Sequence, residues 1–152
     1  MKILLALDGS EFDQIAVEEV IRWPWPSGTE IRVLSVVHPF PYIPLDPVAV
    51  FVFGAAHYDS LKQERERAAR DVDKAAKEIR KRAPGLKVAV EALEGSPKKM
   101  IVEEAERWGA DLIILGSHGH GPAERFLLGS VAQAVVFHAP CSVEVVRGPQ
   151  TP

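Results

Sequence analysis

Three glycines and a serine in the last third of the chain are spaced in a way that suits phosphate binding. Two residues separate Gly116 from Gly119, nine more separate Gly119 from Gly129, and Ser130 follows directly. Glycine lacks Cβ, so it can adopt positive φ and lets backbone N–H groups come close to an anion. With Ser130 as N-cap, the free N–H groups and partial positive charge of a following helix face the same space. The Gly-x2-Gly-x9-Gly-Ser spacing therefore predicts a phosphate-binding loop.

The same residues also fit a plainer interpretation. Glycines after a strand and before a helix are common turn residues, and one or two of them would indicate only a connecting loop. The spacing is not that of a Walker A loop, because no Gly-Lys-Ser or Gly-Lys-Thr follows. Gly119-His120-Gly121 does not extend into a dinucleotide fingerprint either. All four positions together favour phosphate binding over a generic turn.

Basic side chains inside this loop could add positive charge toward a polyphosphate. They are His118, His120 and Arg125. The alternative for each is an exposed side chain with no ligand. The two histidines lack a third nearby ligand of Cys or His type, which argues against a zinc site.

Apolar runs separated by turn residues predict five strands, at 2–7, 30–37, 87–93, 112–115 and 142–146. Helical periodicity lies between them, at about 11–22, 59–82, 97–108 and 130–137, with Ser10 and Ser96 as expected N-caps of the first and third helices. This alternation predicts an α/β fold: a single-domain, open, doubly wound, mostly parallel five-stranded sheet with helices on both faces. The domain spans 1–147, and 148–152 is expected to be a loose tail.

The stretch at 38–58 is the least regular part of the sequence. It has prolines at 39, 41, 44 and 47, followed by an uncharged apolar run from 48 to 56. We expect an irregular loop here, and loops of this length in a domain are usually functional. A lid over a ligand, an oligomer contact, a partner-binding surface and simple packing over one sheet edge all remain open.

Composition narrows the class of protein. With 152 residues and 47% hydrophobic content, the chain is long enough for one domain with a core and no disulfides. A net charge of −3 and a pI near 6.0 argue against electrostatic binding to nucleic acid. The longest apolar runs are too short to cross a membrane, and no signal segment is evident. A single cysteine, Cys141, expected to start a buried strand, fits a reducing cytoplasm.

The first predicted strand also ends in groups that can do chemistry. In open α/β sheets, ligands bind beyond the carboxyl ends of the strands, where the strand order reverses. If the first and fourth strands are neighbours, Asp8 and Gly116 converge there. Asp8 cannot bind phosphate directly, because two anions repel. It could accept a hydrogen bond from ribose or adenine, or help to hold a divalent cation; alternatively it caps the turn at Gly9 and Ser10.

The glycine spacing, the run Ala-Asp-Leu-Ile-Ile-Leu-Gly-Ser-His-Gly at 110–119 and Ala-Leu-Asp-Gly-Ser at 6–10 resemble the universal stress protein family over nearly the whole chain. The resemblance implies strand order 3-2-1-4-5 and the family's ATP-binding branch, with Mg²⁺ or Mn²⁺. It also implies homodimerisation through the last strand. Val36 would meet adenine, although a plain core valine is the alternative. The nucleotide contacts implied by position are Asp8, Val36, Gly116, Ser117, His118, Gly119, Gly129, Ser130 and Val131.

Three functional hypotheses follow. The first is an ATP-binding regulatory or stress-response module with an unidentified protein partner. The second is a slow ATP hydrolase or a phosphoryl- or adenylyl-transferring enzyme, which needs mainly positioning and charge neutralisation. The third is a dimerising scaffold without ligand, which the intact glycine spacing disfavours. No catalytic residue is assigned, because the chain lacks a P-loop lysine and a nucleophile elbow.

Overall fold

Five parallel strands and four helices alternate along the described part of the chain in the computed structural model. The structure describes residues 1–39, 47–117 and 128–148; for residues 47–57 it describes the backbone only. The elements in chain order are β1 Lys2–Leu7, α1 Phe12–Arg22, β2 Glu30–Val37, α2 Pro47–Arg82, β3 Lys87–Glu94, α3 Pro97–Trp108, β4 Leu112–Gly116, α4 Ser130–His138 and β5 Ser142–Val146. The strand order is β3-β2-β1-β4-β5, with every neighbouring pair parallel. The predicted α/β class, order and parallel sheet are confirmed.

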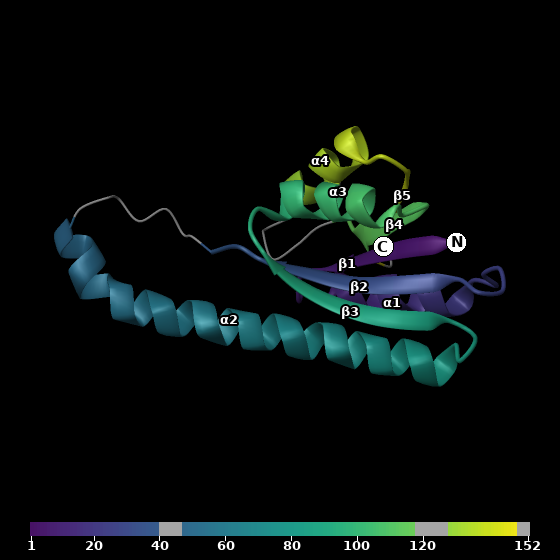
Figure 1. The fold of residues 1–152 in the computed structure, drawn as a ribbon, viewed down its shortest axis with the longest axis horizontal. Helices are drawn as coiled ribbons and strands as arrows, with labels where there is room; N and C mark the ends of the chain where they lie inside the picture. The colour runs from purple at the N-terminus through teal and green to yellow at the C-terminus, as the bar shows by residue number, and fades with distance from the viewer. Residues whose placement is uncertain (40–46, 118–127, 149–152) are drawn as a thin grey trace.

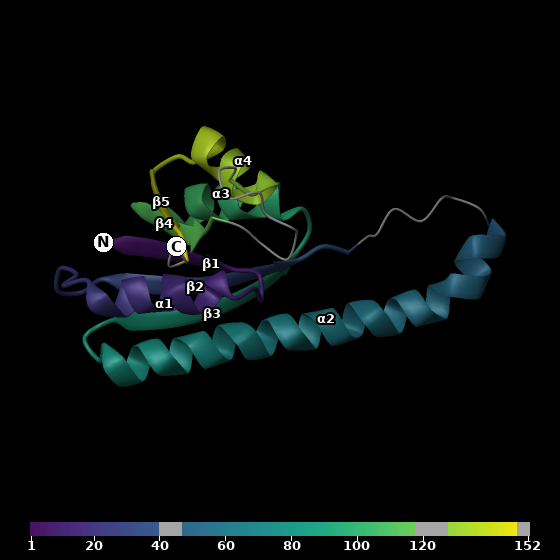
Figure 2. The ribbon, with the colours of Figure 1, turned by 180° about the vertical axis from the view of Figure 1, so that it is seen from behind.

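Helices cover both faces of the sheet, as Figures 1 and 2 show from opposite sides. Alternate residues of β1 point to opposite faces, because side chains along a strand alternate. Ile3, Leu5 and Leu7 pack with α1 and α2, whereas Leu4 and Ala6 pack with α3 and α4. The central strands are therefore buried on both sides, which explains why β1 reads as a continuous apolar run.

The second helix corrects the sequence-based prediction for 38–58. It begins at Pro47 and runs 36 residues to Arg82, so 47–58 is helical and not an irregular loop. Proline is well tolerated in the first helical turn, and the valines and phenylalanines that follow resemble a strand in composition only. The N-terminal turns of α2 extend past the sheet (Figure 1). Residues 40–46 lie outside the described part of the chain.

Helix starts also differ in detail from prediction. The N-cap of α1 is Glu11, and Ser10 precedes it. The N-cap of α4 is Gly129, with Ser130 as the first helical residue. Ser96 is the N-cap of α3 as predicted, but its side chain makes no capping hydrogen bond. Gly129 has the extended backbone of an N-cap, with ψ 152°, whereas Glu11 already has helical backbone angles, so both boundaries differ from prediction by one residue, which is within the usual uncertainty of helix ends.

A buried charge cluster ties α3 to the sheet. The Glu104 side chain is 2% exposed and bonds Arg32 of β2, while Nε of Arg107 donates to its other oxygen at 2.8 Å. The Arg32 guanidinium also lies 4.4 Å from the centre of the Trp108 ring, a cation–π distance. Because both carboxylate oxygens are engaged by arginines, the cluster is a structural device rather than a site for a ligand.

Candidate functional site

Three strand ends meet at the carboxyl edge of the sheet. The register pairs Leu7 of β1 with Ser35 of β2 and Ala6 with Leu115 of β4. Continuing these registers along the strands places Asp8 beside Val36 on one side and beside Ser117, the residue after Gly116, on the other. The sheet thus brings together the strand ends at Asp8 and Gly116, which the sequence predicted would converge, with Val36, placed by the family resemblance, on the neighbouring strand.

The start of α4 is fastened to the end of β4 by backbone hydrogen bonds. The Gly129 N–H donates to the Ser117 carbonyl at 2.7 Å, and the Ser117 N–H donates to the Val146 carbonyl of β5 at 2.8 Å. Ser117 is 1% exposed, whereas Ser130 is exposed at the first position of α4. The N–H groups at the start of a helix have no intrahelical acceptor, so those of Ser130 and Val131 are oriented outward from a positive helix end.

The predicted site residues divide into two groups. Asp8, Val36, Gly116, Ser117, Gly129, Ser130 and Val131 lie on three neighbouring strand ends and the start of α4. His118 and Gly119, together with His120 and Arg125, lie outside the described residues. Val36 is half-buried on the face of the sheet that α3 and α4 cover. It therefore lies on the same face of the sheet as the start of α4.

The turn between β1 and α1 is held by carboxylates. The exposed Asp8 accepts the Ser10 N–H at 3.0 Å through Oδ1, so the predicted capping of this turn by Asp8 is present. Asp13, in the first turn of α1, accepts the N–H of Asp8 at 3.1 Å and that of Gly9 at 2.7 Å. Gly9 has φ +81°, a conformation that glycine adopts without strain.

Asp13 was not among the residues predicted from sequence. Burial raises its pKa to about 6, the backbone N–H donors of Asp8 and Gly9 oppose that rise, and the nearby Asp8 carboxylate adds to it. The available signal was an acidic residue in the first turn of a helix that follows a glycine turn, since such a side chain can reach back to free N–H groups. The periodicity at 11–22 indicated a helix but not this contact.

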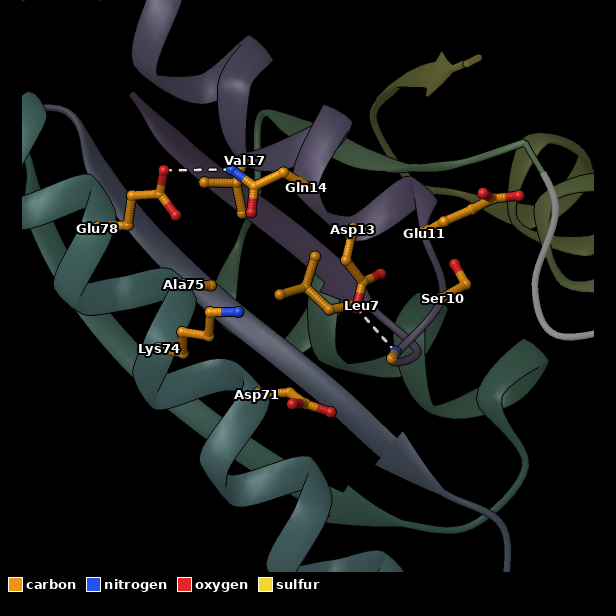
Figure 3. A pocket seen from close by; sticks show the side chains of 11 residues that line it. Leu7, Ser10, Glu11, Asp13, Gln14, Val17, Asp71, Lys74, Ala75 and Glu78 are labelled. Atoms are coloured by element: carbon orange, nitrogen blue, oxygen red, sulfur yellow. Dashed lines mark hydrogen bonds between the residues drawn. The ribbon is translucent and has the colours of Figure 1, made fainter.

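A pocket of about 190 Å³ lies behind this turn, between α1 and α2 (Figure 3). Leu7, Val17 and Ala75 line it and belong to the core on the α1 and α2 face of the sheet. Four carboxylates and one amine also line it: Glu11, Asp13, Asp71, Glu78 and Lys74. It is therefore on the opposite face of the sheet from Val36 and forms a space distinct from the predicted crevice.

The described residues do not form a preformed metal site. Within 1–39, 47–117 and 128–148 no group of three or more His, Cys, Asp or Glu side chains is arranged to hold a metal ion.

The single cysteine is not activated. Burial, and to a smaller extent the nearby Asp111 carboxylate, raises the pKa of the Cys141 thiol, which disfavours the reactive thiolate. In the described part of the chain no helix is long and apolar enough to cross a bilayer.

The profile of the universal stress protein family matches residues 1–147. The chain belongs to this family. Among its relatives, universal stress protein MJ0531 of Methanocaldococcus jannaschii is 36% identical over 149 residues, which cover 98% of this chain and 83% of that protein.

Solved structures agree with the fold. The hypothetical protein MJ0577 has a TM-score of 0.82 at 29% identity, covering 99% of this chain and 97% of that one. Two universal stress proteins solved with nucleotides are more distant at 20% identity. One was solved in complex with cAMP, with TM-score 0.58 and coverage of 97% and 96%. The other, from Arabidopsis thaliana, was solved with AMP bound, with TM-score 0.65 and coverage of 99% and 93%.

Proposed function

We propose that this universal stress protein binds ATP at the carboxyl edge of its sheet and acts as a nucleotide-dependent regulatory module. The observation that carries the proposal is the fastening of α4 to β4 through Gly129 and Ser117, beside the ends of β1 and β2. It puts a helix N-terminus at the crevice where α/β sheets bind ligands. That relatives have been solved with AMP and with cAMP supports a nucleotide as the ligand class.

The phosphates belong at the β4–α4 connection in this proposal. The Gly129 N–H is already engaged by Ser117, so its part is to hold α4 in place. The donors for phosphate are the N–H groups of Ser130 and Val131, the Ser130 hydroxyl and the glycine loop around Gly119. The intact Gly-x2-Gly-x9-Gly-Ser spacing supports a triphosphate rather than a monophosphate, because it matches the ATP-binding branch of the family.

The nucleoside belongs at the ends of β1 and β2. Asp8 would accept a hydrogen bond from ribose or adenine, and the half-buried Val36 would contact the base. Mg²⁺ or Mn²⁺ would enter with the phosphates, with Asp8 as the protein carboxylate in reach. The residues present fit a cation shared with the ligand better than a preformed site, because the described residues form no three-ligand group.

The direct test of this function is mass analysis of small molecules released from freshly purified, denatured protein. We expect ATP, or its products, in close to one copy per chain. Protein incubated with MgATP before release distinguishes the enzymatic alternative: an unchanged triphosphate fits a binding module, and accumulating ADP or AMP fits a hydrolase or transferase. Protein that neither carries nor takes up a nucleotide would fit the ligand-free scaffold instead.

Dimerisation through β5 is a second part of the proposal. The strand order leaves β5 at one edge of the sheet, and an unpaired edge is a template for a second copy. On α4, which leads into β5, Phe137 is 81% exposed and Val136 46% exposed. Apolar surface of this kind beside an open edge supports a contact between two chains.

Light scattering at micromolar concentration tests the dimer. Phe137→Glu should shift the protein toward monomer, because it places a charge in the contact. The control is Val90→Glu, which changes a 39% exposed valine on β3, the opposite edge of the sheet, and should leave the dimer intact. A wild-type protein that is strictly monomeric removes this part of the proposal. Residence in the cytoplasm and a protein partner stay predictions from the sequence.

A further inference from the structure

The turn between β1 and α1 has the backbone features of an anion-binding turn. It follows the central strand of the sheet, Gly9 adopts a left-handed φ of +81°, and α1 begins three residues later at Phe12. Consecutive N–H groups at such a strand-to-helix turn are the usual cradle for phosphate in α/β nucleotide-binding folds. Backbone shape alone would therefore make this turn a competitor for the phosphates of a nucleotide.

The N–H groups of residues 8–10 in this turn already donate hydrogen bonds to carboxylates. The N–H groups of Asp8 and Gly9 donate to the two oxygens of Asp13, at 3.1 and 2.7 Å. The Ser10 N–H donates to Asp8 Oδ1 at 3.0 Å. An anion arriving here would have to displace a carboxylate from each donor while standing close to two negative charges. The turn is therefore closed to phosphate.

Asp13 reaches the turn from helix α1 and accepts the N–H groups of Asp8 and Gly9. It comes from the first turn of α1 and borders the pocket between α1 and α2, whose other ionisable side chains are Glu11, Asp71, Lys74 and Glu78 (Figure 3). Arg67 of α2 donates to the Gly9 carbonyl at 3.4 Å, so both helices fasten the same glycine. Because the carboxylate sits on helix α1 rather than on the loop, its position relative to Gly9 is set by the packing of the fold.

We propose that Asp13 is a specificity-determining residue that closes the β1–α1 turn to phosphate and so sets the direction in which a nucleotide binds. The nucleoside then lies at Asp8, and the phosphates lie at Ser130 and the glycine loop. This inference rests on the proposed function for its consequence, the direction of ATP. The closure of the turn itself can be measured with inorganic triphosphate and needs no nucleotide.

A purely structural role for Asp13 predicts different behaviour. If Asp13 only capped α1, its removal would lower the stability of the helix and leave anion binding unchanged. If only its charge mattered, removing any neighbouring carboxylate would raise anion affinity equally. Closure of the turn predicts that removing Asp13, and not a neighbour, creates phosphate binding at Gly9.

The experiment measures inorganic triphosphate binding, with amide shifts of Gly9 and Ser10 as the local readout, in a Gly119→Val background that disables the other loop. Gly119→Val alone should leave the Gly9 amide unshifted. Adding Asp13→Ala frees two N–H donors and removes a charge, so triphosphate affinity should rise at least about tenfold and the Gly9 amide should shift. The matched control is Glu11→Ala, an exposed pocket carboxylate in the same turn whose side chain makes no capping bond.

A second variant keeps the test decisive. Asp13→Asn preserves shape and one acceptor while removing the charge, so it should give a smaller gain at Gly9 with the same sign. The inference is overturned if neither Asp13 variant gains triphosphate binding, if Glu11→Ala gains as much, or if triphosphate already shifts the Gly9 amide in the wild type. A wild type that binds no ATP would overturn the proposed function only, because the Gly119→Val series is read with inorganic triphosphate.

Discussion

Two strand-to-helix connections meet at the same edge of the sheet, and they differ in whether carboxylates accept their backbone N–H groups. In the β1–α1 turn, Asp8 and Asp13 accept the N–H groups of residues 8–10. In the β4–α4 connection, the described residues 116–117 and 128–131 include no acidic side chain, and α4 starts with Ser130 exposed. The described parts of the two connections thus differ in their carboxylates, and under the proposed function the β1–α1 turn repels a phosphate whereas the β4–α4 connection attracts it.

A glycine turn can bind an anion only if its N–H donors are not already occupied by another acceptor. Glycine provides access to the backbone, but the nearest carboxylate decides whether the N–H groups are available. Under the proposed function, the ribose of ATP lies near the first turn and its triphosphate at the second.

The largest effect is expected from Gly119→Val in the β4–α4 connection. A branched side chain where the backbone meets phosphate should weaken ATP binding at least about 100-fold, roughly 2.7 kcal/mol. Isothermal titration calorimetry with MgATP measures it. Gly85→Val is the matched control, because Gly85 is exposed in the turn before β3 and a Cβ there meets nothing within 4 Å. Unchanged affinity for Gly119→Val would mean that this connection does not hold the phosphates.

Ser130→Asp should separate ATP binding from helix stability. A carboxylate at the first position of α4 repels phosphate and should reduce ATP affinity about tenfold. The same charge favours the positive helix end, so the melting temperature without ligand should stay equal or rise. Gln133→Asp, about one helical turn further along α4, is the control and should reduce affinity less. Weaker binding together with a lower melting temperature would point to damage rather than repulsion.

Asp8→Asn tests the nucleoside end with a smaller expected effect. The amide keeps the oxygen that accepts the Ser10 N–H, so the turn should hold its shape. Losing a charged acceptor for ribose or adenine should weaken ATP about fivefold. Inorganic triphosphate without Mg²⁺, which lacks both the nucleoside and the cation that Asp8 would help to hold, should bind as tightly as before or slightly more tightly. Equal losses for both ligands would contradict the assigned direction.

The smallest effect concerns pH and Asp13. Its pKa is raised from 3.8 to about 6, mainly by burial, so the folded protein holds this proton more tightly than the unfolded chain. A raised carboxyl pKa contributes stability below about pH 4 that is lost as the pH rises to about 6. Melting temperatures of wild type and Asp13→Asn across pH 4 to 7 measure this contribution. Wild type should lose stability relative to Asp13→Asn over that interval, and an opposite slope would be contradictory.

Much of the fold was accessible from the sequence because its signals are local. The apolar runs of β1 and β4, each followed by a turn residue, predicted buried parallel strands that the structure confirms. The predicted start of the second helix, at 59, was wrong because the prolines at 39, 41, 44 and 47 indicated an irregular loop, and Pro47 serves equally as a loop residue or a first helical residue. Composition does not distinguish these two cases when no periodic charged face is present.

The sequence predicted which strand ends meet at the candidate site, but not the hydrogen bonds that hold its turns. Strand order brings Asp8, Val36 and Gly116 to one edge, as the resemblance implied. The hydrogen bond from Gly129 to Ser117 and the reach of Asp13 back to Gly9 depend on how turns fold onto helices. Such contacts are set by three-dimensional packing, so spacing along the chain alone did not reveal them.

Amide chemical shifts of the wild-type protein, recorded with MgATP and with inorganic triphosphate, distinguish the roles of the two turns. Both ligands should shift the amides of Ser130 and Val131, and only MgATP should shift those near Asp8 and Val36. If triphosphate shifts the Gly9 and Ser10 amides while leaving Ser130 and Val131 unchanged, the two turns have been assigned the wrong way round.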